Sequence, residues 1–170
     1  FGCRLIILPP LAFLARPERW LWTIHKHRGT LSASPNFGYD FCCRRLSDEV
    51  LAGLALSCWR RAFNGAEPVS PETVTAFIDR FSTYGFVPEA SAPVYGLAES
   101  SVGLTFPPLG RRPLIDRVQR SALALQGRAE PAAADDPTAL RFVCCGRPLP
   151  GHQVRIVDPA NRELPDRHQG

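Results

Sequence analysis

Apolar side chains recur at helical spacing between positions 70 and 82 of the chain. They occupy positions i, i+3, i+4 and i+7, which form one buried helix face: Val74, Phe77, Ile78 and Phe81. Ser70 precedes them as a capping residue, and Pro71 suits the first helical position. Glu72 complements the helix dipole, and Gly85 predicts the end of the helix. This stretch is the clearest helix that the pattern predicts.

Two further helices are predicted earlier in the chain. One extends from Pro17 to Gly29, and its basic last turn at 25–28 complements the negative end of the helix dipole. The residues on its apolar face are Trp20, Leu21 and Ile24. Asn36 is expected to cap the other helix, whose aromatic residues are Phe37, Tyr39 and Phe41.

Short apolar runs between these helices predict four strands. They lie at 3–8, 30–34, 59–63 and 92–95, and the prolines that follow the first strand are expected to force a turn. Strands that alternate with helices of this length are typical of βαβ units, whose strands pair in parallel. The expected fold class is therefore α/β, with a largely parallel sheet and flanking helices.

The pattern changes after Phe106, where prolines and other loop-forming residues become frequent. One short element is expected at 114–125, and further strands are expected at 140–145 and 154–158.

These changes divide the chain into three parts. Residues 1–106 are interpreted as part of an α/β subdomain, and residues 107–145 as a loop-rich, insertion-like segment. Residues 146–170 are interpreted as the truncated start of a β-rich module, because the last expected strand is cut off by the end of the chain.

The composition is that of a globular chain with little net charge. Of its 170 residues, 45% are hydrophobic and 21% are charged, which argues against wholesale disorder. The 20 Lys and Arg against 16 Asp and Glu leave a net charge of +4, too weak to indicate nucleic acid or an anionic membrane as a partner. The longest apolar run is well short of the roughly 20 residues that span a bilayer. Because the chain begins without methionine inside an apolar run, we expect a central piece of a longer protein.

The cysteines and histidines do not indicate a metal site. The six cysteines include the adjacent pairs 42–43 and 144–145, which lack the spacing of zinc ligands. They are expected to be small buried residues in a reducing, cytoplasmic compartment. His25 and His27 lie two apart on a predicted helix and do not share a face, so we expect solvated residues at a helix end.

Two loops follow predicted strands directly, where an open α/β sheet binds its ligands. In the loop 65–68 a glycine and an alanine leave the backbone open to a flat ring, although such turns are also common structural elements. The loop 95–99 combines a tyrosine, a glycine and a glutamate. Such a carboxylate can share Mg²⁺ with phosphate oxygens, or can simply be a charge at a helix N-terminus. The chain contains no Walker loop, G-x-G-x-x-G, G-x-S-x-G or H-E-x-x-H motif.

Together and in this order, the segments resemble the adenylate-forming superfamily of acyl-CoA synthetases, luciferases and peptide-synthetase adenylation domains. Fatty acyl-AMP ligases are especially similar. Residues 34–39, SPNFGY, resemble the motif that lines the acyl pocket, and residues 63–68, FNGAEP, resemble the adenine-binding segment. Residues 95–100, YGLAES, resemble the motif that stacks on adenine and holds Mg²⁺. GRPLPG at 146–151 resembles the beginning of the small β-barrel subdomain.

The resemblance implies a set of site residues. Those implied for nucleotide binding are Asn64, Gly65, Ala66, Glu67, Pro68, Tyr95, Gly96, Leu97 and Ala98. Those implied for the acyl pocket are Asn36, Phe37 and Gly38. Glu99 is implied as the catalytic residue that holds Mg²⁺. Many family members have threonine where this chain has Ala98, so the α-phosphate would be held by backbone N–H groups or by parts outside the chain.

The activity that the resemblance implies uses ATP and Mg²⁺. A fatty acid carboxylate attacks the α-phosphorus of ATP, giving acyl-AMP and pyrophosphate. The span between Glu99 and Gly146 resembles the insertion linked to acyl transfer onto the phosphopantetheine arm of an acyl carrier protein, although a variable surface loop is an equal interpretation.

Two alternatives stay open: a fatty acyl-CoA synthetase, with coenzyme A as acceptor, and a truncated, non-catalytic nucleotide-binding module. The family's phosphate loop, its ribose-binding aspartate and its C-terminal lysine are not found in the chain. We therefore expect the chain alone to have no turnover.

Overall fold

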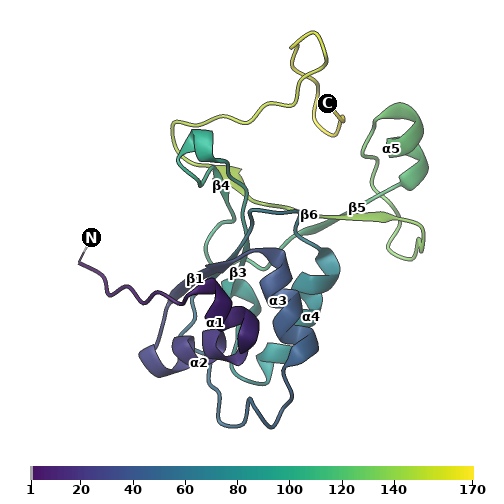
Figure 1. The fold of residues 1–170 in the computed structure, drawn as a ribbon. Helices are drawn as coiled ribbons and strands as arrows, with labels where there is room; N and C mark the ends of the chain where they lie inside the picture. Colours follow the sequence, from purple (N-terminus) through teal and green to yellow (C-terminus); the bar gives the residue numbers. More distant parts are fainter. Residues whose placement is uncertain (1) are drawn as a thin grey trace.

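The N-terminal part of the fold is a three-stranded parallel sheet with helices packed beside it. A computed structural model describes residues 2–170 (Figure 1). The strand order is β1-β2-β3, with β1 at Leu31–Ser34, β2 at Arg61–Asn64 and β3 at Ser91–Pro93. The helices of this part are α1 (Pro10–Ala15), α2 (Glu18–His27), α3 (Asn36–Arg45) and α4 (Pro71–Ser82). The predicted α/β class and the parallel sheet are confirmed.

The strands pair in a register that aligns their carboxyl ends. Ser34 pairs with Asn64, and Asn64 pairs with Pro93. All three strands therefore end at one edge of the sheet, and the residues that follow them meet there.

Helix α4 forms for the reasons that its sequence indicates. The Ser70 hydroxyl accepts a hydrogen bond from the Thr73 N–H at 3.2 Å, and Pro71 occupies the first turn. Phe77 and Phe81 are buried on the inner face. The cap satisfies an N–H group that has no partner inside the helix, and the apolar face attaches the helix to the core.

An aromatic cluster forms the centre of the core. The Trp59 ring lies 5.3 Å from the rings of both Trp20 and Phe86, measured between centroids, in edge-on arrangements. The indole N–H of Trp59 donates to the Arg61 carbonyl at 2.8 Å, and the Tyr39 hydroxyl donates to the Phe63 carbonyl at 2.8 Å. Burial raises the pKa of Tyr39 well above its ordinary value. Since both polar groups are satisfied, the rings can be buried without an unpaired donor.

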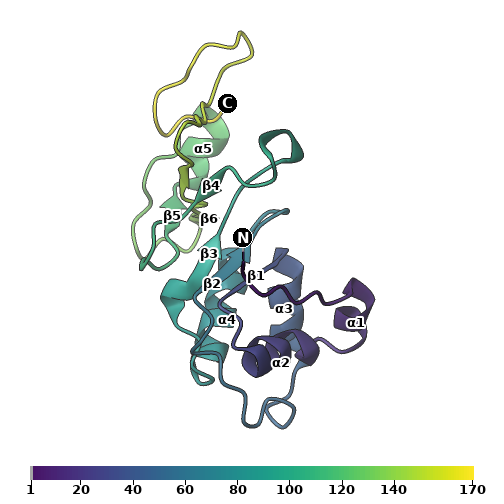
Figure 2. The same ribbon diagram turned by 90° about the vertical axis from the view of Figure 1, so that its left-hand side faces the viewer.

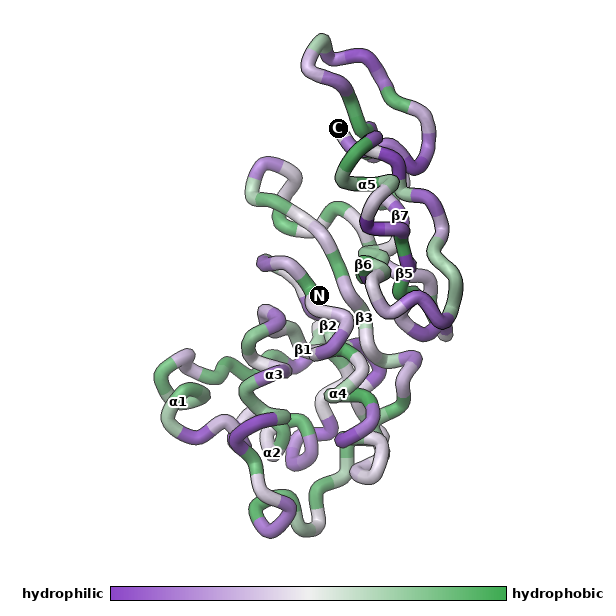
Figure 3. The backbone as a smooth tube through the Cα atoms, turned by 90° about the vertical axis from the view of Figure 1, so that its right-hand side faces the viewer, coloured by the Kyte–Doolittle hydropathy of each residue, from purple (hydrophilic) through white to green (hydrophobic). Residues whose placement is uncertain are grey.

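Three expectations for the first half of the chain are wrong. Residues 3–8 form no strand among the described residues, because the run has no sheet partner there, and Leu5 and Ile7 are 80% and 79% exposed. The prolines that follow do not simply make a turn, because Pro10 begins α1, which is hydrophobic along its length (Figure 3). Asn36 does not cap α3 but is its first helical residue, and Pro35 occupies the N-cap position without a side-chain hydrogen bond.

The other boundaries shift by one or two residues. The predicted helix at 17–29 is observed at 18–27, because Arg28 adopts a left-handed conformation that ends it. The strand expected at 59–63 is observed at 61–64, and that expected at 92–95 is observed at 91–93. The expected buried face of α2 is confirmed. Short 3₁₀ turns lie at Pro88–Ala90 and Ala98–Ser100.

The second half of the chain consists of two small antiparallel ribbons and one helix. β4 (Thr105–Phe106) pairs with β7 (Arg147–Pro148), and β5 (Ile115–Val118) pairs with β6 (Leu140–Val143). The element expected at 114–125 is thus two elements, β5 and helix α5 (Arg120–Gln126).

The expected strand at 140–145 is shortened, and that at 154–158 is wrong. In the latter range only Val157 makes an isolated bridge, to Glu163, because Val154 and Ile156 are exposed and have no sheet to join among the described residues. A barrel start is therefore not confirmed. Among residues 2–170, no helix is both long enough and apolar enough to cross a membrane.

Candidate functional site

The segments singled out in the sequence meet at the carboxyl edge of the sheet. Residues 35–38 follow β1, residues 65–68 follow β2, and residues 94–99 follow β3. Figure 2 shows the loops after β2 and β3 projecting from this same edge. Parallel strands place their carboxyl ends together, and this is where open α/β sheets bind ligands.

The loop after β2 lies against the backbone that follows β3. The Val94 N–H donates to the Asn64 carbonyl at 2.8 Å, and a Cβ added to Gly65 would lie 2.8 Å from the Val94 carbonyl oxygen. Only glycine fits at this approach. Ala66 has a φ of 66°, a left-handed conformation that is uncommon for alanine. Gly65 is buried, whereas Ala66, Glu67 and Pro68 are exposed. The loop therefore has a defined shape and presents its outer side to solvent.

Asn64 has an unusual environment at the end of β2. Its side chain is 3% exposed, and its Nδ2 donates to Asn36 Oδ1 at 3.2 Å. Its own Oδ1 is buried without a hydrogen-bond partner among the described residues. Such a buried, unpaired carbonyl oxygen costs about 1–3 kcal/mol, and a ligand N–H would satisfy it.

The loop after β3 closes on itself. Two N–H groups, from Leu104 and Thr105, donate to the Tyr95 carbonyl at 3.0 and 2.9 Å. The Val102 N–H donates to the Leu97 carbonyl at 3.0 Å. A Cβ on Gly96 would lie 1.6 Å from the Val102 carbonyl oxygen, so no larger residue fits. The closed loop leaves the Tyr95 side chain 50% exposed, so a planar group can reach its ring.

Glu99 lies in the 3₁₀ turn of this loop. It is exposed, and it forms no hydrogen bond or ion pair with other residues in the range 2–170. No three His, Cys, Asp or Glu residues gather as metal ligands in that range. A magnesium ion at this place would therefore take one protein carboxylate. That fits a cation which keeps several waters and shares phosphate oxygens.

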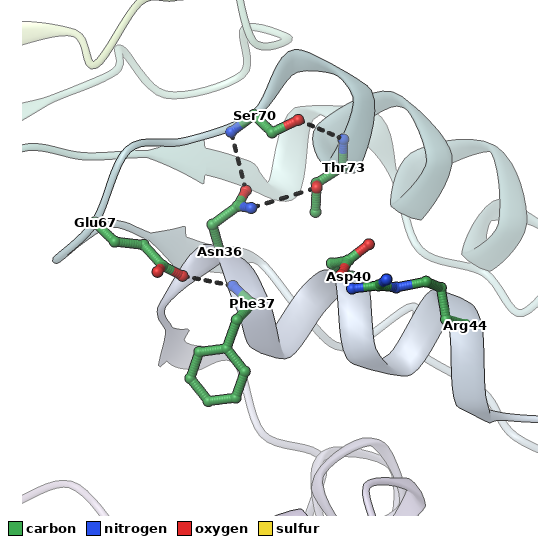
Figure 4. Close-up of polar contacts among 7 residues, drawn as sticks. All are labelled: Asn36, Phe37, Asp40, Arg44, Glu67, Ser70 and Thr73. Atoms are coloured by element: carbon green, nitrogen blue, oxygen red, sulfur yellow. Dashed lines mark hydrogen bonds and ion pairs between the residues drawn. The ribbon is translucent and has the colours of Figure 1, made fainter.

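The residues after β1 connect to the loop after β2. Asn36 Oδ1 accepts from Asn64 Nδ2 and from the Ser70 N–H at 3.1 Å, and Asn36 Nδ2 donates to Thr73 Oγ1 at 3.3 Å. The Phe37 N–H donates to Glu67 Oε1 at 2.6 Å (Figure 4). Sequence reasoning missed Ser70 and Thr73 as partners of Asn36. These contacts span 34 and 37 residues, so no local pattern indicates them.

Phe37 and Gly38 form the other side of this junction. The Phe37 side chain is 45% exposed, and its ring lies 6.3 Å from that of Phe13 on α1. A Cβ on Gly38 would lie 2.1 Å from Ser34 Oγ, so glycine lets α3 begin directly beside β1.

One hollow lies away from the sheet edge. It measures about 550 Å³ and lies by α2, where Trp22, His25, Lys26, Arg28 and Ala55 line it. His25 Nδ1 accepts a hydrogen bond from the Ala55 N–H at 2.9 Å, so this ring nitrogen is engaged with the backbone. The loops are therefore the candidate site, because the hollow contains none of the residues at the ends of the strands.

Comparison with known proteins identifies the family. The family of proteins described as "AMP-binding enzyme" matches residues 1–170 of the chain. The chain belongs to this AMP-binding family.

Relatives of this AMP-binding chain include two bacterial ligases. It is 38% identical over 161 residues to the medium-chain-fatty-acid–[acyl-carrier-protein] ligase TtuA of Teredinibacter turnerae, covering 95% of the chain and 25% of that ligase. It is 41% identical over 159 residues to the ligase JamA of Moorena producens, which has the same description, covering 93% and 27%. The AMP-binding chain thus spans about a quarter of the length of these relatives.

A solved structure agrees with this result. Fatty acyl-adenylate ligase from L. pneumophila, in complex with acyl adenylate and pyrophosphate, is 39% identical and superposes with a TM-score of 0.82. The match covers 89% of this AMP-binding chain and 26% of that ligase. The α/β fold of this AMP-binding chain is therefore shared with that solved structure.

Proposed function

We propose that the complete protein carrying this chain is a fatty acyl-AMP ligase. In the reaction, a fatty acid carboxylate oxygen forms a bond to the α-phosphorus of ATP, and the bond to the pyrophosphate oxygen breaks. The products are acyl-AMP and pyrophosphate. The observation that carries the proposal is the convergence of three family-like segments on one carboxyl edge of the parallel sheet.

The nucleotide would bind between the loops that follow β2 and β3. The half-exposed Tyr95 offers a ring for stacking on adenine, and the close-packed Gly65 and Gly96 keep both loops in a defined shape. The orphaned Asn64 Oδ1 is an acceptor that suits the exocyclic amine of adenine. The exposed residues Ala66, Pro68, Leu97 and Ala98 would complete this wall.

Glu99 would hold Mg²⁺ together with phosphate oxygens. Its exposure and its lack of a protein partner among residues 2–170 leave the carboxylate available. The ion, when bound, would offset negative charge on the phosphates as pyrophosphate leaves. The acyl chain would lie on the other side of the junction, against the exposed Phe37 ring and beside Gly38.

The acceptor of the acyl group is proposed to be the phosphopantetheine arm of an acyl carrier protein. This rests on the descriptions of the two relatives as acyl-carrier-protein ligases. The six cysteines are free, which agrees with a proposed location in the cytoplasm.

The test is to incubate the complete protein with ATP, Mg²⁺ and medium- or long-chain fatty acids, then offer a carrier protein and coenzyme A side by side. We expect acyl-AMP by mass spectrometry, followed by acyl transfer to the carrier protein. Transfer to coenzyme A at a higher rate would favour an acyl-CoA synthetase instead, and absence of acyl-AMP with every acid would refute the proposal.

A further inference from the structure

Helix α3 receives its N-terminal partner from the nucleotide loop. The N-cap position is Pro35, which forms no side-chain hydrogen bond, and the first turn contains no acidic residue. The Phe37 N–H, which has no acceptor inside the helix, donates to Glu67 Oε1 at 2.6 Å instead. The carboxylate at the positive end of this helix therefore comes from a residue 30 positions away (Figure 4).

Asn36 makes the reverse connection. Its Oδ1 accepts hydrogen bonds from Asn64 Nδ2 and from the Ser70 N–H, at 3.2 and 3.1 Å. These two donors lie on either side of the loop 65–68. One oxygen of the acyl-side motif therefore anchors both ends of the nucleotide loop. Asn36 Nδ2 also donates to Thr73 in α4, so the side chain is occupied by protein groups.

The loop that Asn36 anchors needs such support. Ala66 has a positive φ of 66°, and Gly65 is pressed against the Val94 carbonyl. Unfavourable conformations of this kind persist where the surrounding structure over-determines them. Two hydrogen bonds at the ends of the loop supply that constraint.

From these contacts we propose that Glu67 and Asn36 are crossed positioning residues. Glu67, in the nucleotide loop, sets the position of the acyl-side helix α3, and Asn36, in the acyl-side motif, sets the shape of the nucleotide loop. The two substrate sites are thereby mechanically coupled. This inference rests on the function proposed above.

The first test varies Glu67 in the complete protein. Pyrophosphate release is measured while fatty acid and ATP are varied separately. Loss of one hydrogen bond worth about 1 kcal/mol predicts that Glu67→Ala raises the KM for fatty acid about fivefold, with the KM for ATP changed less than about twofold. Glu67→Gln keeps an oxygen acceptor for the Phe37 N–H and should restore most of the loss. Glu49→Ala, an exposed glutamate in a distant turn, is the matched control.

The second test varies Asn36. Asn36→Ala should raise the KM for ATP about 30-fold, with a smaller change for fatty acid, because two anchors of the nucleotide loop, each worth about 1 kcal/mol, are lost. Asn36→Asp keeps the oxygen that accepts from Asn64 and Ser70, so its KM for ATP should stay within about threefold of wild type.

Equal thermal unfolding midpoints for Glu67→Ala and Glu67→Gln would exclude a general loss of stability.

The outcomes separate this inference from the proposed function. Suppose that the wild-type protein is active. If Glu67→Ala then raises only the KM for ATP, or Asn36→Ala raises only the KM for fatty acid, the crossed roles are refuted and the ligase assignment stands. A wild-type protein that releases no pyrophosphate with any fatty acid would refute both. If Asn36→Ala does not fold, the exposed Glu67 variants still decide the question.

Discussion

Replacement of Gly96 by alanine should separate the Tyr95 segment from the loop that carries Glu99. The added Cβ would lie 1.6 Å from the Val102 carbonyl oxygen and 2.7 Å from its carbonyl carbon. Real Cβ contacts are almost never shorter than 3.0 Å, so one of the two backbones must move by about 1.4 Å. Neither neighbour is the end of a flexible side chain, so the displacement must pass into the loop itself.

The expected effect is on catalysis more than on stability. A misplacement of about 1 Å in a positioned group can reduce a rate by about 10²-fold. We therefore predict that kcat/KM for ATP in Gly96→Ala falls about 10²-fold, measured by pyrophosphate release from the complete protein. The core is distant from this exposed loop, so the thermal unfolding midpoint should fall by only a few degrees.

Gly29→Ala is the matched control. A Cβ at Gly29 would meet Ile24 at 3.5 Å, an ordinary contact, and Gly29 does not need a positive φ. Its kcat/KM should stay within about twofold of wild type. A Gly96→Ala protein as active as Gly29→Ala would show that the loop 97–102 does not have to be held in place, and would contradict the proposed roles of Tyr95 and Glu99.

Three further predictions test the site and the core. Glu99→Ala should reduce adenylation at least about 10²-fold and weaken the dependence of its rate on Mg²⁺, whereas an unchanged Mg²⁺ titration would remove the assigned metal role. Phe81→Ala should lower the free energy of unfolding by about 3–5 kcal/mol, because the Phe81 ring is fully buried and its centroid lies 4.4 Å from that of Phe77. Val87→Ala, at an exposed position, is the control and should change the free energy of unfolding by less than about 0.5 kcal/mol. Burial raises the pKa of Cys43 to about 11. Because only the thiolate reacts, alkylation of Cys43 by iodoacetamide should become about 10²-fold faster between pH 8 and pH 10. Peptide mass spectrometry would follow this reaction, and a Cys43 rate at pH 8 equal to that in urea would show that the thiol is not buried.

The sequence predicted the elements that depend on local chemistry. Helix α4 carries its own cap, proline and apolar face, so its existence and start were correct. The loops at 65–68 and 95–99 were located from their position after strands, and the structure brings them to one sheet edge. Both are consequences of patterns within about ten residues.

Other features depend on partners far away in the chain. The apolar run 3–8 looks like a strand, but a strand exists only where a neighbour pairs with it. The expected strand at 154–158 fails for the same reason. The double connection between Asn36 and the nucleotide loop could not be predicted, because residues more than 25 positions apart have to meet before it appears.

The most direct test of the central claim is fatty-acid-dependent pyrophosphate release by the complete protein in the presence of ATP and Mg²⁺. The account predicts release that requires all three components, with an equal amount of acyl-AMP accumulating when no acceptor is present. Pyrophosphate release that is independent of fatty acid, or no release with any medium- or long-chain acid, would contradict it.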